Sequence, residues 1–385
     1  ESLTPISISL LPPLSFGRGK ANLVALNIVA GHSSRLEGVE VRGLVGINDR
    51  SVRGWQIAGG ANIVGGPVFG GQIAGGVNHA RGAVAGVQIA GGVDYAGAGV
   101  VGAQVAGGAA VAGDDVYGVQ VAGAATVARA GLVGAQIAGA VASAGKDVRG
   151  IQVAGASSIT AGHLEGVQIA GGMNIAGGVS GLQIGVVNIG GVVEGGQIGV
   201  VNIASSVRGV QIGVVNLAKD VQGLPVGVLS FVRDGRIALE AWGGDSTFGN
   251  LTLKLGTRWV HSLFNLGLAS LEMDRDERWT LGAGFGAHFD HPGRSYLDID
   301  ASVDSVRSGL RLEESNELLC RLRMTAGLEL TSRLAVFVGV GVGVFVSDRL
   351  GSCGICGPSL APSRTYQGNG AVVRIWPGLV AGIRI

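Results

Sequence analysis

Hydrophobic and polar residues alternate along most of this chain with a period of two, which predicts β-strands. Residues 86–96 are typical, because apolar side chains fall on one face and polar or small side chains on the other. The two faces are Val87, Ile89, Val93 and Tyr95, against Gln88, Ala90, Gly92 and Asp94. A helix is disfavoured, since each glycine in a helix interior costs ~1 kcal/mol.

The strand pattern recurs as a tandem repeat marked by glutamine in a Gly-x-Gln-Ile/Val motif. The step is 16 residues along the first eight copies, and then 15, 14 and 14 residues. Glu40 holds the same place one step earlier, and Pro225 one step later. We expect one shared environment for the polar positions of the repeat, which are Gln56, Gln72, Gln88, Gln104, Gln120, Gln136, Gln152, Gln168, Gln183, Gln197 and Gln211.

Charged residues fall in the joints between these units, and Asp94 is the one exception between Gln56 and Gln211. Each unit therefore offers roughly 10–11 uncharged strand residues, close to the ~9–11 residues of a transmembrane β-strand. The outward Val and Ile face would contact lipid in that arrangement.

From about Arg236 the repeat ends, and charged residues alternate with large apolar ones. About eight strands are predicted, which begin near Arg236, Leu251, Phe264, Trp279, Tyr296, Leu319, Leu334 and Ala371. This pattern favours a membrane barrel with a polar interior over a soluble sandwich with a charged face in water. The charged side chains predicted to line the lumen are Glu240, Lys254, Asp298, Asp300, Asp304, Arg321, Arg323, Glu329 and Arg374.

Two all-β folds fit the pattern. The favoured one is a single antiparallel transmembrane β-barrel of ~23–24 strands, because the repeat faces carry no charge and two-residue joints suit hairpins. The alternative is a β-solenoid repeat domain followed by a barrel of about eight strands, which the regular 16-residue step supports. Either fold divides the chain into N-terminal strands (1–35), the Gly-rich repeat region (36–232) and C-terminal barrel strands (233–385) with a long loop at 348–370.

Composition narrows the possible functions. Glycine supplies 72 of the 385 residues, only 14% are charged, and the formal net charge is +1. A net charge this close to zero does not provide the excess of positive charge that is typical of nucleic-acid-binding proteins. The chain shows no catalytic triad, no phosphate-binding loop and no histidine spacing for a metal, so we expect no enzymatic activity, cofactor or metal. The CxxC pair Cys353 and Cys356 is a disulfide candidate.

The run from Gly209 to Ala218, Gly-Val-Gln-Ile-Gly-Val-Val-Asn-Leu-Ala, resembles a family of bacterial surface-repeat proteins. Members of that family carry tandem Gly-x-Gln-Ile/Leu-Gly-x-x-Asn-x-Ala units followed by barrel-like strands. The resemblance implies a location in the outer membrane, at the surface of a diderm bacterium, and it implies no activity. Ile385 departs from the aromatic residue that often ends such barrels.

The sequence therefore predicts a non-enzymatic outer-membrane β-barrel protein, which is either porin-like or a structural component of the membrane. The alternative function is a surface-exposed repeat protein for adhesion, partner binding or self-assembly. Membrane lipid is the expected partner, and a second copy or another outer-membrane protein is a further candidate. A large uncharged surface of Gly, Ala and Val would suit association between copies.

Overall fold

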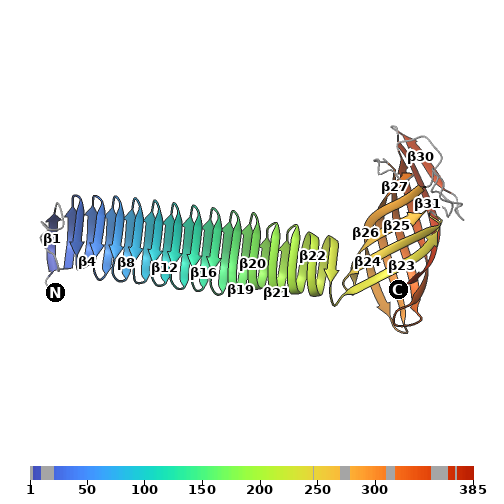
Figure 1. The fold of residues 1–385 in the computed structure, drawn as a ribbon, viewed down its shortest axis with the longest axis horizontal. Coiled ribbons are helices and arrows are strands. Elements are labelled where there is room, and N and C mark those ends of the chain that lie inside the picture. Colours follow the sequence, from blue (N-terminus) through green and yellow to red (C-terminus); the bar gives the residue numbers. More distant parts are fainter. Residues whose placement is uncertain are drawn as a thin grey trace. The chain divides into compact units, whose positions relative to one another are not determined.

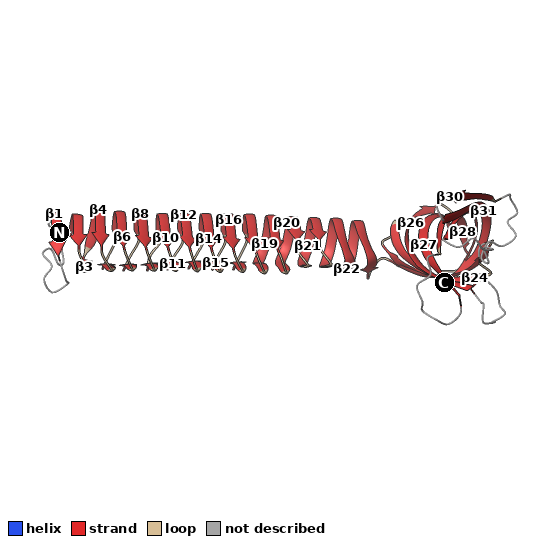
Figure 2. Cartoon of the chain, turned by 90° about the horizontal axis from the view of Figure 1, so that it is seen from above, coloured by secondary structure: helices blue, strands red, loops and turns tan. Residues whose placement is uncertain are grey.

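The computed structural model describes residues 3–9, 21–245, 247–268, 278–308, 317–347, 363–368 and 371–385. Their regular structure consists of β-strands in two sheets, one parallel and one antiparallel (Figures 1 and 2). By its internal contacts the chain divides into two compact units, Glu1–Arg208 and Gly209–Ile385. None of the described residues belongs to a helix that is long and apolar enough to cross a membrane.

The repeats form a β-solenoid in which each coil contributes one long and one short strand. The long strands are β4 (Arg35–Arg42), β6 (Val52–Ala58), β8 (Val68–Ala74), β10 (Val84–Ala90), β12 (Val100–Ala106), β14 (Val116–Ala122), β16 (Leu132–Ala138) and β18 (Val148–Ala154). The short strands are β5 (Val45–Asn48), β7 (Ala61–Val64), β9 (Val77–Ala80), β11 (Val93–Ala96), β13 (Ala109–Ala112), β15 (Ala125–Ala128) and β17 (Val141–Ala144). Later coils run through β19 (Ser157–Ala170), β20 (Met173–Ile184), β21 (Val187–Ile198) and β22 (Val201–Val232).

Each strand pairs in parallel with its equivalent one coil later, so the prediction of one antiparallel barrel of 23–24 strands is wrong. Val84 is paired with Val100 and Gln88 with Gln104, a register of one 16-residue coil. Antiparallel hairpins would reverse alternate units and would not align equivalent residues. The alternative, a β-solenoid followed by an eight-stranded barrel, is confirmed.

The shortened repeat is accommodated at a corner of the solenoid. Thr160 is paired with Ala176 and His163 with Gly178, so the register shifts by one residue between them. The first strands belong to the same sheet, since β1 (Leu3–Ser9) pairs with β2 (Ala21–Asn27), which pairs with β4. Strand β3 (Ala30–Ser33) likewise pairs with β5. Residues 21–35 therefore continue the solenoid and do not form a separate layer.

A stack of glycines with positive φ runs along the long strands. At Gly118 φ is 141°, and a Cβ there would overlap the carbonyl oxygen of Gly102 in the preceding coil. Only glycine adopts this conformation without strain and also allows so close an approach of two backbones. The equivalent positions with positive φ are Gly54, Gly70, Gly86, Gly102, Gly134, Gly150, Gly166, Gly181, Gly195, Gly209 and Gly223.

The C-terminal sheet is a closed antiparallel barrel, since β23 pairs with both β24 and β31. Its eight strands are β23 (Arg236–Gly244), β24 (Gly249–Gly256), β25 (Val260–Leu268), β26 (Arg278–His291), β27 (Ser295–Ser308), β28 (Leu318–Glu329), β29 (Ala335–Ser347) and β31 (Ala371–Arg384). All eight begin within four residues of the predicted starts. Strand β30 (Arg364–Gly368) pairs with β31 inside the segment expected as a loop, and residues 348–362 lie outside the described residues.

The barrel is polar inside and apolar outside. On β27, Asp298, Asp300 and Asp304 are at most 2% exposed, whereas Ile299 and Val303 are 39% and 52% exposed. Two groups of larger side chains fill the rest of the interior. They are Trp242, Tyr296, Ala335 and Phe337, and Val306, Leu319, Phe345 and Trp376. Membrane barrels have the same polarity of inner and outer faces.

The glycine stack predicts a large effect of a single methyl group. Gly118→Ala should destabilise the central coils by at least about 2 kcal/mol, because it adds backbone strain to the overlap with Gly102. Amide hydrogen exchange of residues 100–138 in the full chain measures this change. Gly131→Ala is the matched control, since its Cβ would approach only the Asp115 carboxylate and the Asp147 carbonyl at 3.1 Å. Equal effects of both substitutions would contradict the role of the stack.

Candidate functional site

The predicted polar positions of the repeat form a buried ladder of amides inside the solenoid. All eleven glutamines from Gln56 to Gln211 are fully buried. Gln104 Nε2 donates to Gln88 Oε1 at 2.7 Å, and the bond recurs between successive glutamines from Gln56 to Gln197 at 2.7–2.9 Å. The second amide proton of Gln120 is donated to the Val127 carbonyl of the facing strand at 3.3 Å. The glutamines therefore join the long strands of the solenoid to its short strands and line no pore.

A carboxylate ends this ladder at its first coil. Every glutamine donates toward the N-terminus, so the first one, Gln56, needs an acceptor, and Glu40 Oε2 lies 3.4 Å from its Nε2. Asn48 donates to the same oxygen at 2.8 Å, and the Arg42 guanidinium pairs with the other oxygen. Burial lowers the pKa of Arg42, and its interaction with Glu40 opposes that shift. A carboxylate suits this position because it has acceptor sites and no donor.

A second, shorter ladder runs in the opposite direction and also ends in a carboxylate. Asn62 Nδ2 donates to Asn78 Oδ1 at 2.9 Å, and Asn78 Nδ2 donates to Asp94 Oδ1 at 2.8 Å. The other Asp94 oxygen accepts from the Val105 amide at 3.1 Å. Asp94 is fully buried, and this burial raises its pKa to about 6. Asp94, the one charged residue inside the repeat units, thus accepts the last hydrogen bond of the asparagine ladder.

Charged side chains from five barrel strands form an ion network inside the barrel, with Lys254 at its centre. Its Nζ lies 2.9 Å from Glu240 Oε1, 2.7 Å from Asp298 Oδ2 and 2.8 Å from Asp300 Oδ2. Arg323 pairs with Asp300 at 2.9 Å. The network balances four carboxylates with four cations, Glu240, Asp298, Asp300 and Asp304 against Lys254, Arg321, Arg323 and Arg384.

Aromatic and amide groups complete the coordination of the two arginines on β28. Arg321 Nε donates to Asp304 at 3.1 Å, and Arg321 Nη1 donates to Asn250 Oδ1 at 3.0 Å. The Trp242 ring centroid lies 5.1 Å from the Arg321 guanidinium carbon and 4.2 Å from that of Arg323. These cation–π contacts separate two like charges that follow one another on the inner face.

The structure brings together seven of the nine charged residues predicted for the lumen, and all seven are buried in the barrel. Glu329 lies apart from them, 42% exposed and 3.5 Å from Arg236. Arg374 bonds to Ser363 at 3.2 Å.

The predicted set omits three members of the network, Arg384, His261 and His288. Strand parity places Arg384 opposite the apolar positions of the last strand, which was a usable signal. No sequence signal places the two histidines in the network, because their partners Asp298 and Asp300 are distant in sequence.

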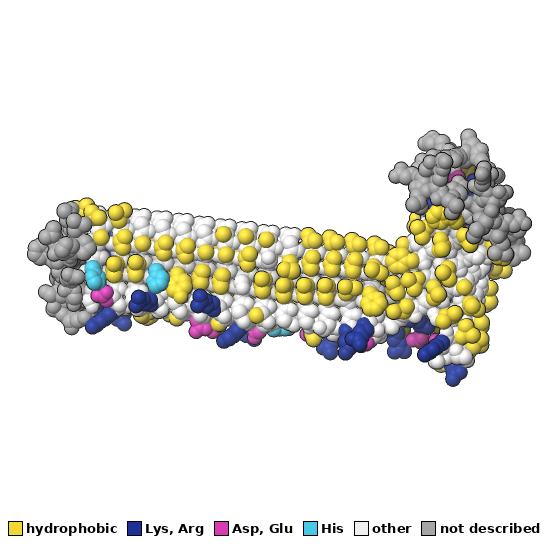
Figure 3. Space-filling view, in the orientation of Figure 1, with side chains coloured by type: hydrophobic (Ala, Val, Ile, Leu, Met, Phe, Trp, Pro, Cys, Tyr) yellow, Lys and Arg dark blue, Asp and Glu magenta, His cyan; other side chains and the backbone are white. Residues whose placement is uncertain are grey.

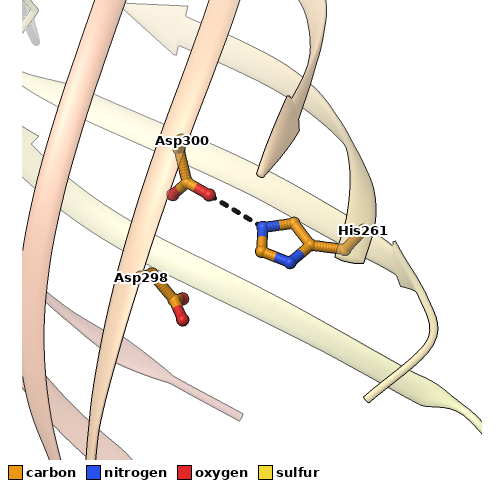
Figure 4. Close-up of side chains that lie close together, drawn as sticks. All are labelled: His261, Asp298 and Asp300. Carbon is orange, nitrogen blue, oxygen red and sulfur yellow. Dashed lines mark hydrogen bonds and ion pairs between the residues drawn. The ribbon is translucent and has the colours of Figure 1, made fainter. Parts of the chain in front are cut away.

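The geometry of the network favours a lysine over a metal ion. Ligand atoms of His261, Asp298 and Asp300 lie within 4.8 Å of one another, and His261 Nε2 is 2.7 Å from Asp300 Oδ1 (Figure 4). The Lys254 ammonium already takes the cation position against both aspartates. A cavity of about 10 Å³ remains beside Lys254, His261 and Asp298, which is room for one water at most. These side chains therefore form a closed salt-bridge network.

The sulfur chemistry predicted for the loop is not tested by this structure, since Cys353 and Cys356 lie outside the described residues. Cys320 on β28 is a free cysteine.

Comparisons with protein-family models, with curated proteins and with solved structures return no match to this chain. The fold therefore defines the class of the protein, an all-β chain that joins a parallel β-solenoid to an eight-stranded antiparallel barrel.

The buried carboxylate of Asp94 predicts a pH-dependent stability of the solenoid. Its pKa is raised to about 6 in the fold from 3.8, so the folded state binds the proton more tightly. The stabilisation is complete below about pH 4 and is lost as the pH rises through 6, by up to about 3 kcal/mol. Urea unfolding at intervals between pH 4 and 8 measures it. In Asp94→Asn this decline should disappear, and an unchanged pH profile would contradict the assignment.

Proposed function

We propose that this chain is a non-enzymatic outer-membrane protein of a diderm bacterium, in which the barrel is a membrane anchor for the repeat domain. The observation that carries the proposal is the inverted polarity of the barrel. Leu322, Met324 and Val338 point outward and are about half exposed or more, while Arg321 and Arg323, which alternate with Leu322 and Met324 on β28, are buried. A water-soluble barrel would hide the leucines and expose the arginines.

The filled interior favours an anchor over a porin. Barrels of about eight strands have interiors that side chains can fill, whereas the water-filled channels belong to barrels of 16–18 strands. Here Lys254 and its three carboxylates occupy the centre, and the two aromatic groups occupy further interior positions. Passage of solutes would require breaking a buried, charge-balanced network, which costs several kcal/mol.

The repeat domain supports a binding or assembly role and no catalysis. Its interior is occupied by hydrogen-bonded amides, alanines and a row of valines and leucines, and its titratable interior groups, Glu40, Arg42 and Asp94, are bonded to neighbours. What remains available to a partner is the outer surface of the two sheets. Adhesion, partner binding or self-assembly through this surface is the alternative function that the repeat pattern suggests.

A charge on the outer face of the barrel tests the membrane anchor. Leu322→Arg should destabilise the vesicle-inserted protein by ~2–4 kcal/mol, because it moves an arginine into hydrocarbon near the middle of β28. Heat-modifiable gel migration across a urea series measures the folded fraction. Ser332→Arg, which adds the same charge in the turn after β28, should change little. A Leu322→Arg protein as stable as the Ser332→Arg protein would contradict insertion.

The same vesicle-inserted protein distinguishes an anchor from a porin. In planar bilayers we expect no stable single-channel steps, since Lys254 and its ion-pair partners leave a cavity of only about 10 Å³ beside them. The insertion control is the gel migration of protein recovered from the bilayer preparation. Large, reproducible conductance steps that grow with salt concentration would support the porin hypothesis and contradict the anchor.

A further inference from the structure

We propose that the solenoid is itself a lipid-binding element, which lies in the plane of a bilayer with one long edge immersed in hydrocarbon. This edge, the glycine edge, consists of the turns that follow the long strands. These are Gly59–Gly60, Gly75–Gly76, Gly91–Gly92, Gly107–Gly108, Gly123–Ala124, Gly139–Ala140, Gly155–Ala156 and Gly171–Gly172. The inference goes beyond the anchoring role of the barrel and does not depend on it.

Both outer faces of the solenoid are mainly apolar up to the glycine edge, and His79, Ser143 and Ser157 are polar positions on the short strands. On the long-strand sheet, Ile137 and Ile151 are 45% and 47% exposed. The short-strand sheet presents Val111, Val127 and Ile159, which are partly exposed. Figure 3 shows the hydrophobic side chains as rows along the visible face. Contiguous apolar surface of this extent marks an interaction site or a membrane contact.

The charges of the solenoid gather on the opposite edge, which we call the charged edge. From Arg53 to Arg208, every charged side chain except the buried Asp94 lies in the turn before a long strand, at the second position of that strand, or at the equivalent position within β19, β21 or β22. These residues are Arg53, Arg81, Asp114, Asp115, Arg129, Lys146, Asp147, Arg149, Glu165, Glu194 and Arg208. The cross-section of the solenoid is therefore amphipathic. Its uncharged side matches hydrocarbon, and its mixed charges match zwitterionic headgroups.

The backbone amides of the glycine edge meet one requirement for entering lipid. In hydrocarbon each amide and carbonyl group must be bonded within the protein. Gly92 N donates to Gly76 O at 2.8 Å, Gly108 N to Gly92 O at 2.7 Å, and Ala124 N to Gly108 O at 2.8 Å. The amide protons of the turns are thus donated from coil to coil, whereas the carbonyl of the first residue of each turn accepts no amide of the described backbone, and that of Gly91 faces Gly107 instead. An ordinary surface turn leaves such amide protons to water.

The shape of the apolar surface favours lipid over a second copy of the chain. Apolar side chains predominate on both faces, and the glycine edge between them carries no polar side chain, so a face-to-face dimer would leave one face in water. A fluid hydrocarbon phase covers all three sides at once.

The orientation follows from the charged edge and the length. Ten coils extend about 45 Å along the axis, at ~4.8 Å for each coil, which exceeds the ~30 Å hydrocarbon core. Because charges lie along this whole length, an axis across the bilayer would bury several of them. An axis parallel to the membrane keeps them in water.

Single-cysteine probes in the full chain test the inference. With Cys320, Cys353 and Cys356 replaced by serine, Ala124→Cys puts a bimane label on the glycine edge, and Lys146→Cys puts it on the charged edge. In phosphatidylcholine vesicles we expect brominated lipid to quench the Ala124 label at least about twofold more than the Lys146 label. Iodide in the buffer should show the reverse order.

A third label on Val338→Cys, on the outer face of the barrel, separates this inference from the membrane anchor. If the Val338 label is quenched by brominated lipid and the Ala124 label only by iodide, the anchor stands and the inference is wrong. If the Ala124 label is quenched by brominated lipid and the Val338 label is not, the inference stands and the anchor is wrong. An Ala124 label protected from both quenchers indicates contact with protein, and overturns the inference in favour of association between copies.

Discussion

Parallel stacking of each residue on its own equivalent is the constraint from which the solenoid follows. When coil lies on coil in register, a buried position favours a residue that packs against a copy of itself one strand spacing, ~4.8 Å, away. Glutamine satisfies this rule because its amide both donates and accepts along the axis. Glycine satisfies it at Gly102 and Gly118 because two backbones approach where a Cβ would overlap a carbonyl oxygen. The repeat is thus a consequence of the stacking geometry.

The same stacking constraint explains the residues at the ends of the amide ladders. A row of amides that donates in one direction leaves an unmatched donor at its last member, and a buried unmatched donor costs about 1–3 kcal/mol. Glu40 and Asp94 each stand at such an end, and each accepts from a neighbouring amide. The two solutions differ in charge balance. Arg42 pairs with Glu40, whereas Asp94 has hydrogen-bond donors alone and holds its proton up to a higher pH.

The sequence could predict the strands, their faces and the polar positions, because each depends on local alternation and on the period of the repeat. It could not decide how the units pair. Gln88 faces inward in a membrane barrel and in a solenoid alike, with Ile89 outward, so the burial pattern is the same in both folds. The decision depends on whether Gln88 lies beside Gln104 or beside a reversed strand. For the barrel, strand parity was sufficient for Asp298 and Arg323, but the link through His288 depends on contacts that no local pattern encodes.

Both parts of the chain bury polar groups behind a largely apolar exterior, and they stabilise these buried groups in two different ways. The solenoid uses neutral amides, which can repeat indefinitely because identical groups bond to one another. The barrel uses charges, which cannot stack on their own kind and must alternate in sign, as Asp300 does with Lys254 and Arg323. A charged interior therefore suits a closed barrel, which has a fixed number of strands. An amide interior suits a solenoid, to which further coils can be added. The change from the parallel to the antiparallel sheet after β22 follows from this difference, since the neutral ladder gives way there to strands whose inner faces complement each other in charge.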